Sequence, residues 1–536
     1  MTEASDVFAG IDIGSASVRV GLYDPMGHRL SFAVRPILQF RPKSLFVEQS
    51  SADIWSALSS ALREAVQRSG RAACDIAAIG VDATCSLVAV GADGLGVSVA
   101  EDGDPARDII MWMDHRAGAE TAEINATRDP ALAYVGGEVS IEMEVPKVLW
   151  MKRHRPKAHE AVMRYFDLAD YIVWRMTGAD VASTCTLGCK WNWLAHEGRF
   201  SQSLLAAVGL SDLTEKVPAQ VRAIGKVAGH LAGGVAADLG LRPGIAVATG
   251  IIDAHAGGLA LAAGQPKGTL VLISGTSTCH MLVSRDPVMV PGVWGPYYDA
   301  MVPGWWLSEG GQSATGSLLD WTLRQSPACA EAEAQAKAAG KSLHAILNSW
   351  VRDLQLREPW PAADLHVLPD HHGNRSPRAN PHARGTVMGL TMEDGPDALA
   401  RLYLATIEAL AYGTRHIIET MNRAGHQIER LVMCGGGTKN PLLMQVHADA
   451  IGLDIHLAED EDAVTLGSGV MAAVAAGAFA DIPAAAQTMV RPGGKVVARA
   501  ETAAYHAAKY QIFLTMSDHA ATARNAMAAF AAGKRA

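Results

Sequence analysis

"FAGIDIGSASVRVGLYDPMGHRLSFAVRPI", residues 8–37, is the stretch that predicts the core of the fold. Two short apolar runs flank a turn at Gly14–Ser17, and the following DPMG turn leads into a third run. This pattern predicts a three-stranded antiparallel meander. A helix-like stretch at 50–70 and a strand-like stretch at 75–90 follow, so the opening indicates an α/β layer rather than an all-β sandwich.

A second hairpin with the same chemistry lies in the later half of the chain. Gly275–Thr278 follows one apolar run and precedes another, as Gly14–Ser17 does. Because glycine followed by hydroxylated residues is common in turns, the two hairpins alone leave duplication and coincidence equally open. The later half also contains a long amphipathic helix at 398–425, a strand, glycine turn and helix at 428–452, and a small-residue helix at 465–477. A repeated domain is the simplest interpretation.

We therefore predict two domains, residues 1–264 and 265–500, followed by an alanine-rich helix at 501–536. The chain of 536 residues is longer than one hydrophobic core usually organises. The irregular stretch from about 100 to 245, with its tryptophans and turns, is interpreted as insertions around a cleft between the domains. A ligand site in that cleft is the expectation that follows.

Composition narrows the classes of partner and the compartment. The 46 Lys and Arg are outnumbered by 55 Asp and Glu, and no basic block is present, so nucleic acid is not expected as a partner. No secretory signal is recognised near the start, and the richest uncharged stretch, 466–480, is too short and glycine-rich to span a membrane. Seven cysteines without regular spacing suggest reduced thiols, and we predict a cytoplasmic protein.

Three glycine-containing turns are candidates for binding phosphate: Gly14–Ser17, Gly275–Ser277 and Gly435–Gly437. Backbone N–H groups in such turns and at helix starts can reach phosphate oxygens without obstruction from side chains. The sequence contains no GxxxxGK[ST] loop and no GxGxxG pattern opening a strand–helix unit. The chain is therefore predicted to be neither a P-loop enzyme nor a dinucleotide dehydrogenase.

Two aspartates follow apolar strands and are candidates for chemistry. Asp12 stands just before the first turn, where a carboxylate can hold Mg²⁺ directly or through water, or can simply cap the turn. Asp253 ends the apolar run of residues 247–252, where it can accept a hydroxyl proton in a phosphoryl transfer, or cap the helix that begins near Ala254. Both interpretations can hold for the same residue.

Scattered polar residues are candidates for binding a substrate with several hydroxyl groups. They are Thr84, Cys85, Asp114, His115, Lys190 and Glu309. Each one taken alone is equally explained as a loop or rim residue. Cys185 and Cys189 form a CxxxC pair without a partner pair, so they are predicted to be two small core thiols, and no zinc is assigned to them.

Taken together, these motifs resemble the FGGY carbohydrate kinases, of the actin, hexokinase and Hsp70 superfamily with its duplicated ribonuclease H-like domains. The match covers roughly residues 7–480. It rests on six motifs in the family's order: GIDIGSASVRVGLYD (10–24), GIIDAHAGG (250–258), ISGTSTC (273–279), EGGQSATG (309–316), CGGGTKNPLLMQVHADAIG (434–452) and TLGSGVMAA (465–473). The resemblance implies an α/β fold of two such domains with a cleft between them.

The resemblance implies ATP and Mg²⁺ as cofactors, Asp253 as the base, and Asp12 and Asp253 near the metal. It implies that Thr84, Cys85, Asp114, Lys190, Asp253 and Glu309 bind the sugar. It assigns the nucleotide and its phosphates to Gly14, Ser15, Gly275, Thr276, Ser277, Gly311, Gln312, Gly436, Gly437 and Asn440. The expected partners are a small sugar and ATP, without nucleic acid or membrane, and a homodimer is left open.

Within this family, three strings look like the pentulose branch. TCSLV at 84–88 is similar to the D-ribulose kinases, and EMEVPKVLW at 142–150 and CKWNW at 189–193 point to the same branch and to L-ribulose kinases. The arginine-bearing motif of glycerol kinases and the methionine–histidine pair of xylulose kinases are absent from 84–88. D-Ribulose is the favoured substrate, and L-ribulose, ribitol or another pentulose stays open.

Two other functions remain open on the same scaffold. Fold alone does not establish activity, so a catalytically idle sugar or nucleotide sensor is one alternative, and a chaperone-like ATPase is the other. Asp12, Asp253 and both hydroxyl-containing glycine turns are present, which favours a working kinase over an idle sensor.

Overall fold

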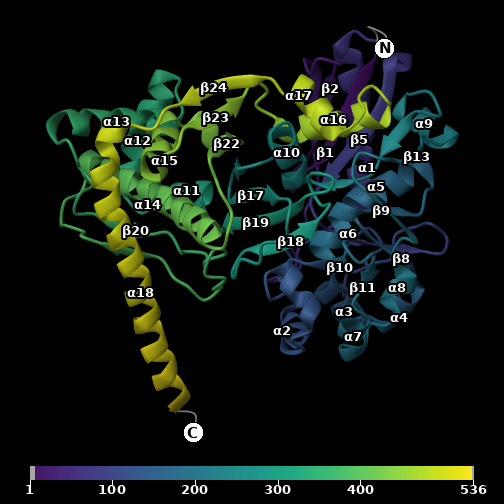
Figure 1. Cartoon of the computed structure of the whole chain (residues 1–536), viewed down its shortest axis with the longest axis horizontal. Helices are drawn as coiled ribbons and strands as arrows, with labels where there is room; N and C mark the ends of the chain where they lie inside the picture. Colours follow the sequence, from purple (N-terminus) through teal and green to yellow (C-terminus); the bar gives the residue numbers. More distant parts are fainter. Residues whose placement is uncertain (1–5, 534–536) are drawn as a thin grey trace.

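The computed structural model describes residues 6–533, and the chain forms two lobes, each built on a seven-stranded sheet (Figure 1). The outermost parts of the predicted ranges, residues 1–5 and 534–536, lie outside the described part, as does half of the segment judged for a secretory signal. None of the helices in the described part is both long and apolar enough to cross a membrane.

The sheet of the first lobe begins with the predicted meander. β1 (Val7–Ile13), β2 (Ser17–Tyr23) and β3 (Arg29–Pro36) pair antiparallel in sequence order. On the other side of β1 the sheet continues with β5 (Ile76–Ala83) and β14 (Ala246–Ala248), both parallel, and then with antiparallel β13 (Val227–His230). The short β15 (Ile251–Ile252) also pairs parallel to β5.

The sheet of the second lobe repeats this order. β16 (Thr269–Ser274), β17 (Thr278–Ser284) and β19 (Trp306–Gln312) form an antiparallel meander, and β18 (Trp294–Tyr298) lies beyond β19. Next to β16 come parallel β22 (Arg430–Cys434) and β23 (Ile455–Ala458), then antiparallel β24 (Pro492–Val496). The shared order of six strands confirms the predicted duplication.

Helices cover the sheets and, in part, cross between the lobes. α1 (Ser51–Ser69) packs on β2 and β3, and α14 (Pro396–Arg423) packs on α15 (Pro441–Ile451) in the second lobe. α10 (Asp253–Ala262) packs on β16, whereas α16 (Ala463–Ala475) packs on β1 and β5 of the first lobe. A helix of each repeat, α10 or α16, therefore contacts the sheet of the other repeat, and α10 and α16 pack against one another.

Two glycines permit the close approach of α16 to the first sheet. A Cβ atom on Gly10 of β1 would overlap the carbonyl oxygen of Thr465, and one on Gly80 of β5 would overlap that of Ser468. Any larger residue would push the helix away from the strands, because backbone atoms cannot give way as a flexible side chain can. The domain boundary at residue 264 stays a prediction, because α16 follows that boundary in the sequence but packs on the sheet of the first lobe.

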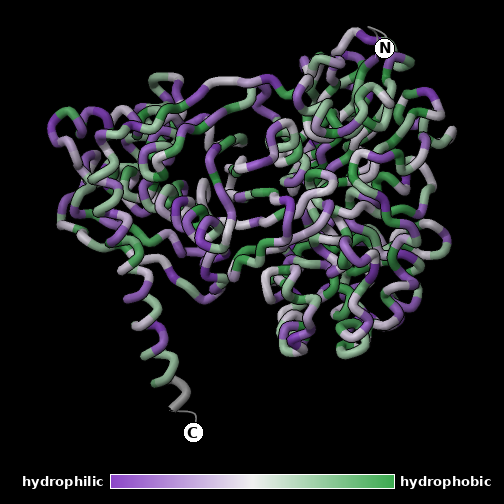
Figure 2. Tube along the Cα trace, viewed as in Figure 1, coloured by the Kyte–Doolittle hydropathy of each residue, from purple (hydrophilic) through white to green (hydrophobic). Residues whose placement is uncertain are grey.

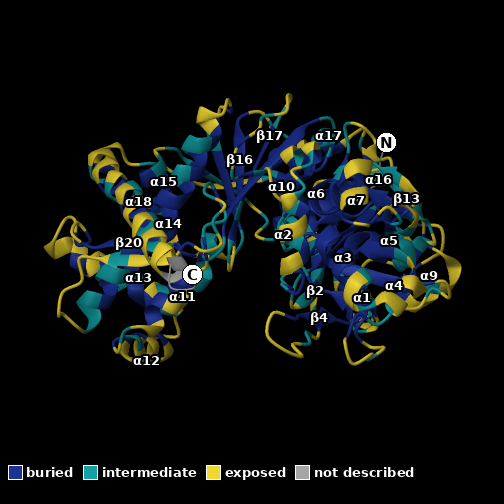
Figure 3. Cartoon of the chain, turned by 90° about the horizontal axis from the view of Figure 1, so that it is seen from below, coloured by how far each residue is buried: buried dark blue, intermediate teal, exposed yellow. Residues whose placement is uncertain are grey.

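Insertions decorate both lobes. In the first they include α3 (Glu144–His154), α6 (Thr184–Lys190) and a four-stranded sheet of β4 (Glu48–Gln49), β7 (Ile109–Ile110), β6 (Leu87–Gly91) and β8 (Val162–Asp167). In the second they include α11 (Gly316–Arg324), α12 (Cys329–Ala339), α13 (Leu343–Arg357), β20 (His366–Leu368) and β21 (Thr386–Met388). Figure 3 shows both sheets as buried and the lobes diverging from the junction around β16, β17 and α10.

The predicted C-terminal helix is α18 (Ala503–Gly533), which runs away from the second lobe (Figure 1). Its first turns are anchored by Tyr510 and Phe513 in the hydrophobic core and by an ion pair between Lys509 and Glu408 of α14. Hydrophilic and apolar residues alternate along the second half of this helix (Figure 2). Beyond Ser517 most described residues of α18 are exposed.

Candidate active site

Three carboxylates meet where the parallel strands of the first sheet end. Asp12 of β1 and Asp82 of β5 stand opposite one another in the register, and both are fully buried. β15 continues this edge, with Ile251 opposite Asp82, and Asp253 follows as the first residue of α10. Strand pairing alone thus brings together residues 12, 82 and 253.

An arginine ties this cluster to the second half of the chain. Arg19 faces Asp12 in the β1–β2 register and forms ion pairs with both Asp12 and Asp462. The Arg19–Asp462 separation is 3.0 Å, and Asp462 also caps α16 by accepting a hydrogen bond from the Thr465 N–H. From α16, the Ser468 hydroxyl donates to Asp82 at 2.6 Å. The carboxylates therefore lie at the contact between the two halves.

Burial disfavours the ionised form of all three carboxyl groups in this cluster. Burial raises the pKa of Asp12 to about 7; Arg19 opposes this shift, and Asp462 and Asp253 add to it. Burial, followed by the neighbouring Asp12, raises the pKa of Asp82 well above its usual range. Burial also raises the pKa of Asp253, opposed by the Ala254 N–H and Arg19. One positive side chain does not neutralise these groups.

The donor set fits a hard divalent cation. Oδ1 of Asp12 and Oδ1 of Asp82 are buried and accept no hydrogen bond from the described residues. Carboxylate oxygens are the protein ligands that Mg²⁺ uses, directly or through water. A divalent charge here would favour the ionised carboxylates, which burial and, for Asp12 and Asp82, the neighbouring acids disfavour. Asp12 and Asp82 are the residues that would hold it.

Asp253 combines the two roles that its sequence position left open. It stands at the start of α10, where its Oδ1 accepts a hydrogen bond of 2.6 Å from the N–H of Ala254. Its side chain is partly exposed, and Oδ2 has no hydrogen-bond partner among the described residues. One oxygen is therefore held by the helix start, and the other is available to a hydroxyl group.

Lys190 and Glu309 are both buried, and Lys190 is close enough to Asp253 to lower the pKa of its carboxyl group. Lys190 ends α6, and its Nζ lies 4.9 Å from the centroid of the Trp294 ring, which Arg375 also faces at 5.1 Å. Burial opposes the ionisation of Glu309, but Lys190, His255 and Arg375 outweigh it and lower the pKa of Glu309 to about 2. The result is a buried carboxylate and ammonium, suited to recognise a polar ligand.

His255 connects this pair to two thiols. Its Nε2 lies 3.1 Å from Oε2 of Glu309, and its Nδ1 lies 3.1 Å from Sγ of Cys185 and 3.9 Å from Sγ of Cys189. Burial disfavours the charged imidazole, but Cys185 and Glu309 outweigh it and raise the pKa of His255 to about 9. The two cysteines are buried, as predicted from the sequence, but they face a histidine that the spacing did not reveal.

The other predicted sugar-binding residues lie in more crowded surroundings. The Thr84 N–H donates to the Ile13 carbonyl at 2.9 Å, which places Thr84 beside the end of β1. Cys85 is buried near Lys190, and burial raises the pKa of its thiol. Asp114 is buried with its oxygens occupied by the Val47 N–H at 2.6 Å and by Arg116. A sugar contact through the Asp114 carboxylate stays a prediction.

The two hairpin turns have the predicted form. The Gly14 N–H donates to the Ser17 carbonyl at 3.0 Å, and the Gly275 N–H to the Ser277 carbonyl at 2.8 Å. The Ser15 hydroxyl accepts a hydrogen bond from the Trp112 indole N–H at 2.9 Å. No hydrogen bond within residues 6–533 joins one turn to the other.

The Gly275–Ser277 turn is tied to the start of α11. Its carbonyl oxygens accept hydrogen bonds from the backbone N–H groups of Thr315, Gly316 and Ser317. Gly275 and Thr276 themselves are exposed. This turn is the part of the second lobe whose backbone is held in place yet faces outward, as a phosphate-binding turn requires.

The third glycine turn, Gly435–Gly437, follows β22. A Cβ on Gly437 would overlap the Ser274 hydroxyl, whereas nothing lies within 4 Å of the Cβ position of Gly436, which is exposed. Gly436 therefore offers open space in front of its backbone. Asn440 caps α15, accepting from the Leu443 N–H at 3.3 Å and donating to the Tyr403 hydroxyl at 2.8 Å, so its side chain is already engaged.

Gln312 and Gly311 complete the predicted nucleotide set. The Gln312 amide donates to the Leu410 carbonyl at 3.0 Å and to the Thr414 hydroxyl at 2.9 Å, which anchors β19 to α14. The Gly311 carbonyl accepts from the Ser376 N–H at 3.1 Å. Contacts of these two residues with a nucleotide stay predictions.

Sequence reasoning missed several residues of the site. They are Arg19, Asp82, His255, Trp294, Arg375 and Asp462. For Asp82 a signal existed, because GVDAT at 80–84 matches the Gly-x-Asp spacing of GIDIG at 10–14. For Arg375 there was none, since it reaches Glu309 from a loop 66 positions further along the chain.

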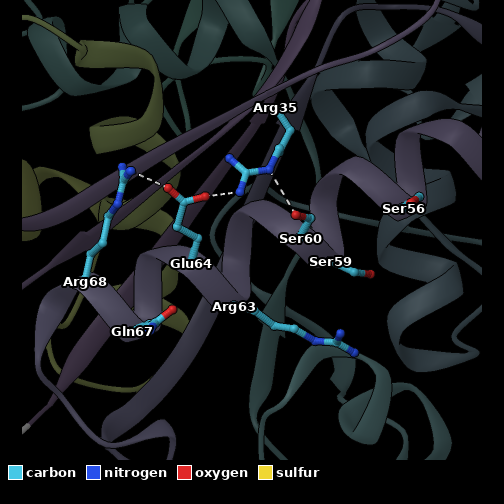
Figure 4. Close-up of a pocket in the computed structure, with 8 residues that line it drawn as sticks. All are labelled: Arg35, Ser56, Ser59, Ser60, Arg63, Glu64, Gln67 and Arg68. Carbon is cyan, nitrogen blue, oxygen red and sulfur yellow. Dashed lines mark hydrogen bonds and ion pairs between the residues drawn. The ribbon is translucent and has the colours of Figure 1, made fainter.

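A separate concave surface lies on the outer face of α1 and β3 (Figure 4). It is lined by Arg35, Ser56, Ser59, Ser60, Arg63, Glu64, Gln67 and Arg68. Arg35 and Arg68 both form ion pairs with Glu64, and Arg63 donates to the Asp238 carbonyl. The arginines are thus committed to protein acceptors, and this surface contains none of the predicted site residues.

Comparisons with known proteins agree with this geometry. The model of the N-terminal domain of the FGGY family of carbohydrate kinases matches residues 7–260, and the model of its C-terminal domain matches residues 270–476. An FGGY carbohydrate kinase domain-containing protein of Homo sapiens is 43% identical over 532 residues, which cover 96% of each chain. A D-ribulokinase of Saccharomyces cerevisiae is 38% identical over 515 residues, covering 88% of this chain and 72% of that protein.

Among solved structures, a xylulose kinase from Rhodospirillum rubrum superposes with a TM-score of 0.79 at 26% sequence identity, covering 95% of this chain and 98% of that one. The two family models together match most of the chain, one for each of the two lobes. The chain belongs to the FGGY family of carbohydrate kinases.

Proposed function

We propose that this carbohydrate kinase transfers the γ-phosphoryl group of ATP to a terminal hydroxyl of a pentulose, with the 5-hydroxyl of D-ribulose as the favoured acceptor. The observation that carries the proposal is that Asp253 interacts electrostatically both with the buried Lys190 and with the Asp12 and Asp82 carboxylates. Lys190 and its neighbour Glu309 are suited to a polyhydroxy ligand, and the carboxylates are suited to a cation that accompanies phosphate. The 38% identity to a D-ribulokinase supports the choice of sugar.

In the proposed reaction, the sugar hydroxyl oxygen forms a bond to the γ-phosphorus while the bond from that phosphorus to the β–γ bridging oxygen breaks, releasing ADP. Asp253 Oδ2 accepts the hydroxyl proton. Lys190 and Glu309 orient the sugar through hydrogen bonds to its oxygens. The backbone N–H groups of Thr276, Ser277 and Gly436 donate to phosphate oxygens, while the Gly275 N–H holds the turn together.

Mg²⁺ held by Asp12 and Asp82 would offset the negative charge of the nucleotide phosphates. The lobes contribute opposite sides of the site, so their closure would exclude water, which otherwise competes with the sugar as acceptor. The nucleotide, the metal and the closure are parts of the proposal.

The test is ADP release by the purified enzyme with Mg-ATP and a panel of acceptors. The panel contains D-ribulose, L-ribulose, D-xylulose, L-xylulose, ribitol and glycerol, compared by kcat/KM. We expect the highest value for D-ribulose and little release without sugar. A higher value for another acceptor would replace D-ribulose, release without sugar would indicate an ATPase, and sugar binding without release would indicate a sensor.

A further inference from the structure

Cys185, Cys189 and His255 form a buried cluster that the proposed reaction does not use. The cysteines stand one helical turn apart on α6, on the same face, and His255 comes from α10. Their exposed fractions are 0%, 0% and 1%. The two sulfur atoms and one ring nitrogen all lie within 4.8 Å of one another.

The spacing of these atoms suits a tetrahedral metal site. With Zn–S bonds of about 2.3 Å and Zn–N bonds of about 2.0 Å, tetrahedral geometry separates a sulfur and a nitrogen ligand by about 3.5 Å. The separations from His255 Nδ1 are 3.1 Å to Cys185 and 3.9 Å to Cys189, one on each side of that value. Small rotations of the side chains would equalise them.

A second, independent feature is the carboxylate behind the histidine. Glu309 Oε2 lies 3.1 Å from His255 Nε2, the ring nitrogen that faces away from the thiols. Histidines that bind metals regularly donate their other N–H to a carboxylate, which selects the tautomer and orients the ring. With the proton held on Nε2, the lone pair of Nδ1 points toward the two sulfurs. Two inert core thiols would need neither this orientation nor the carboxylate.

We propose that Cys185, Cys189 and His255 bind a zinc ion through Sγ, Sγ and Nδ1, with a water molecule as fourth ligand. Binding forms two Zn–S bonds and one Zn–N bond, and the protons of both thiols, together with any proton on Nδ1, leave to solvent. Two thiolates neutralise Zn²⁺, whereas Cu⁺ would leave one net negative charge inside the protein, where charge is costly. The sequence prediction of no zinc relied on the lack of a second cysteine pair; His255 supplies the missing ligand.

Such an ion would join the two helices that carry residues of the proposed active site. Lys190 directly follows Cys189 on α6, and Asp253 precedes His255 by two positions on α10. Glu309 bonds to the metal-binding ring itself. The zinc would therefore position Lys190, Glu309 and Asp253 relative to one another without touching the substrate. Metal binding does not depend on the identity of the sugar or on the kinase reaction.

The test measures metal content in a background without the exposed thiol and the two partly exposed ones, Cys74→Ser with Cys279→Ser and Cys329→Ser. The full-length protein is expressed with added zinc, purified under reducing conditions, passed over a mild chelating resin and analysed by mass spectrometry of the metals. We expect about one zinc per chain, and its loss in Cys185→Ser, Cys189→Ser and His255→Gln. Cys434→Ala removes a buried thiol of β22 outside the cluster and should keep the zinc.

Cobalt provides a readout that needs none of the cluster variants to fold. Co²⁺ loaded in place of zinc into the background protein should give thiolate-to-metal charge-transfer absorption and the visible bands of a tetrahedral site. Circular dichroism of each variant separates metal loss from unfolding. Zinc that the resin strips from the background protein, copper in its place, zinc retained by a folded His255→Gln variant, or cobalt without thiolate bands would each overturn the proposal. None of these measurements involves sugar or ATP, so failure of the kinase proposal leaves them unaffected.

Discussion

The two lobes have the same order of six strands but different residues at equivalent strand ends. In the first lobe, Asp12 of β1 lies opposite Asp82 of β5, two positions before the glycine of the hairpin turn. In the second lobe the equivalent pair is Ile273 of β16 opposite Cys434 of β22. One lobe thus presents acids at this edge, and the other presents uncharged groups beside exposed glycine turns.

This difference shows how a duplicated scaffold can divide one task. A phosphate donor needs a cation and a base near the transferred group, and it needs uncharged N–H donors around its oxygens. Acids at the strand ends of both lobes would repel the phosphates, and uncharged groups at both strand ends would leave nothing to hold the cation. We therefore expect substitutions at the acidic edge to act on turnover and those at the glycine turns to act on nucleotide binding.

The largest effect is expected from Asp253→Ala, which removes the proposed base from the acidic side of the comparison. Turnover should fall roughly 10²-fold or more, while folding and ATP binding persist. Steady-state kinetics with saturating sugar and Mg-ATP provide the measurement, and nucleotide binding by calorimetry is the control. Near-normal turnover would remove Asp253 from its role as base.

Gly80→Ala tests whether the acidic edge depends on the crossing of α16 from the other half. The added methyl group would overlap the Ser468 carbonyl, so the free energy of unfolding should fall by about 3 kcal/mol. Denaturant unfolding provides the measurement. Gly436→Ala is the matched control, because no atom lies within 4 Å of that position.

The control is informative in its own right. Gly436→Ala should leave stability unchanged but raise the KM for ATP by up to about tenfold, the equivalent of one weakened hydrogen bond. Equal losses of stability in Gly80→Ala and Gly436→Ala would contradict the close packing that distinguishes Gly80 from Gly436.

Asp12→Asn tests the cation-binding part of the acidic edge. The dependence of activity on Mg²⁺ should shift to higher concentration, with activity at limiting Mg²⁺ lower by roughly 10- to 100-fold. The measurement is a Mg²⁺ titration at fixed ATP. Ile273→Val, at the equivalent position of the other lobe, should leave the Mg²⁺ titration as it is in the unmodified enzyme. The same shift in both variants would mean that cation binding is not confined to the acidic strand ends of the first lobe.

The smallest expected effect is the pH dependence of stability in the second lobe, which comes from His280. Burial lowers the pKa of His280 to about 3, and the nearby His447 adds to the shift, so His280 is neutral when folded and gains a proton on unfolding below pH 6.5. Its contribution to stability is complete above that pH and decreases as the pH falls toward 3, by about 1 kcal/mol at pH 6. The protection factors of the β17 amides, which exclude the intrinsic effect of pH on exchange, should therefore fall between pH 7 and pH 5.

His280→Asn serves as the control for this pH dependence. It removes the titrating group, so the exchange of β17, corrected for the intrinsic effect of pH, should change less between pH 7 and pH 5 than in the unmodified protein. An identical pH dependence in both would assign the effect to other groups.

Much of the fold was predictable, because local patterns specify it. The turn at Gly14–Ser17 between apolar runs predicted the first meander, and the equivalent turn at Gly275 predicted a second hairpin. The crossing of α16 onto β1 was not predictable, because the small residues that permit it only indicate that something packs closely. The partner is chosen by the complementary glycines, Gly10 and Gly80, more than 380 positions away.

The candidate site divides in the same way. Asp12 and Asp253 were found because Asp12 lies near the end of an apolar strand and Asp253 directly follows one, and strand ends are where a sheet exposes reactive groups. Asp114 was proposed as one of several scattered polar residues, yet its carboxylate is enclosed by Arg116 and a backbone N–H. Whether a carboxylate is free or already paired depends on side chains from other segments.

By itself, the sequence determined the duplicated α/β architecture, the glycine turns and the two principal aspartates, since each depends on residues adjacent in the chain. Only the tertiary structure decided that Asp82 joins Asp12, that His255 faces both Cys185 and Cys189, and that Arg19 holds Asp462. The physical reason is that hydrogen bonding and charge balance act over a few ångströms in space. Separations along the chain contain little information about such distances until the strands and helices have packed.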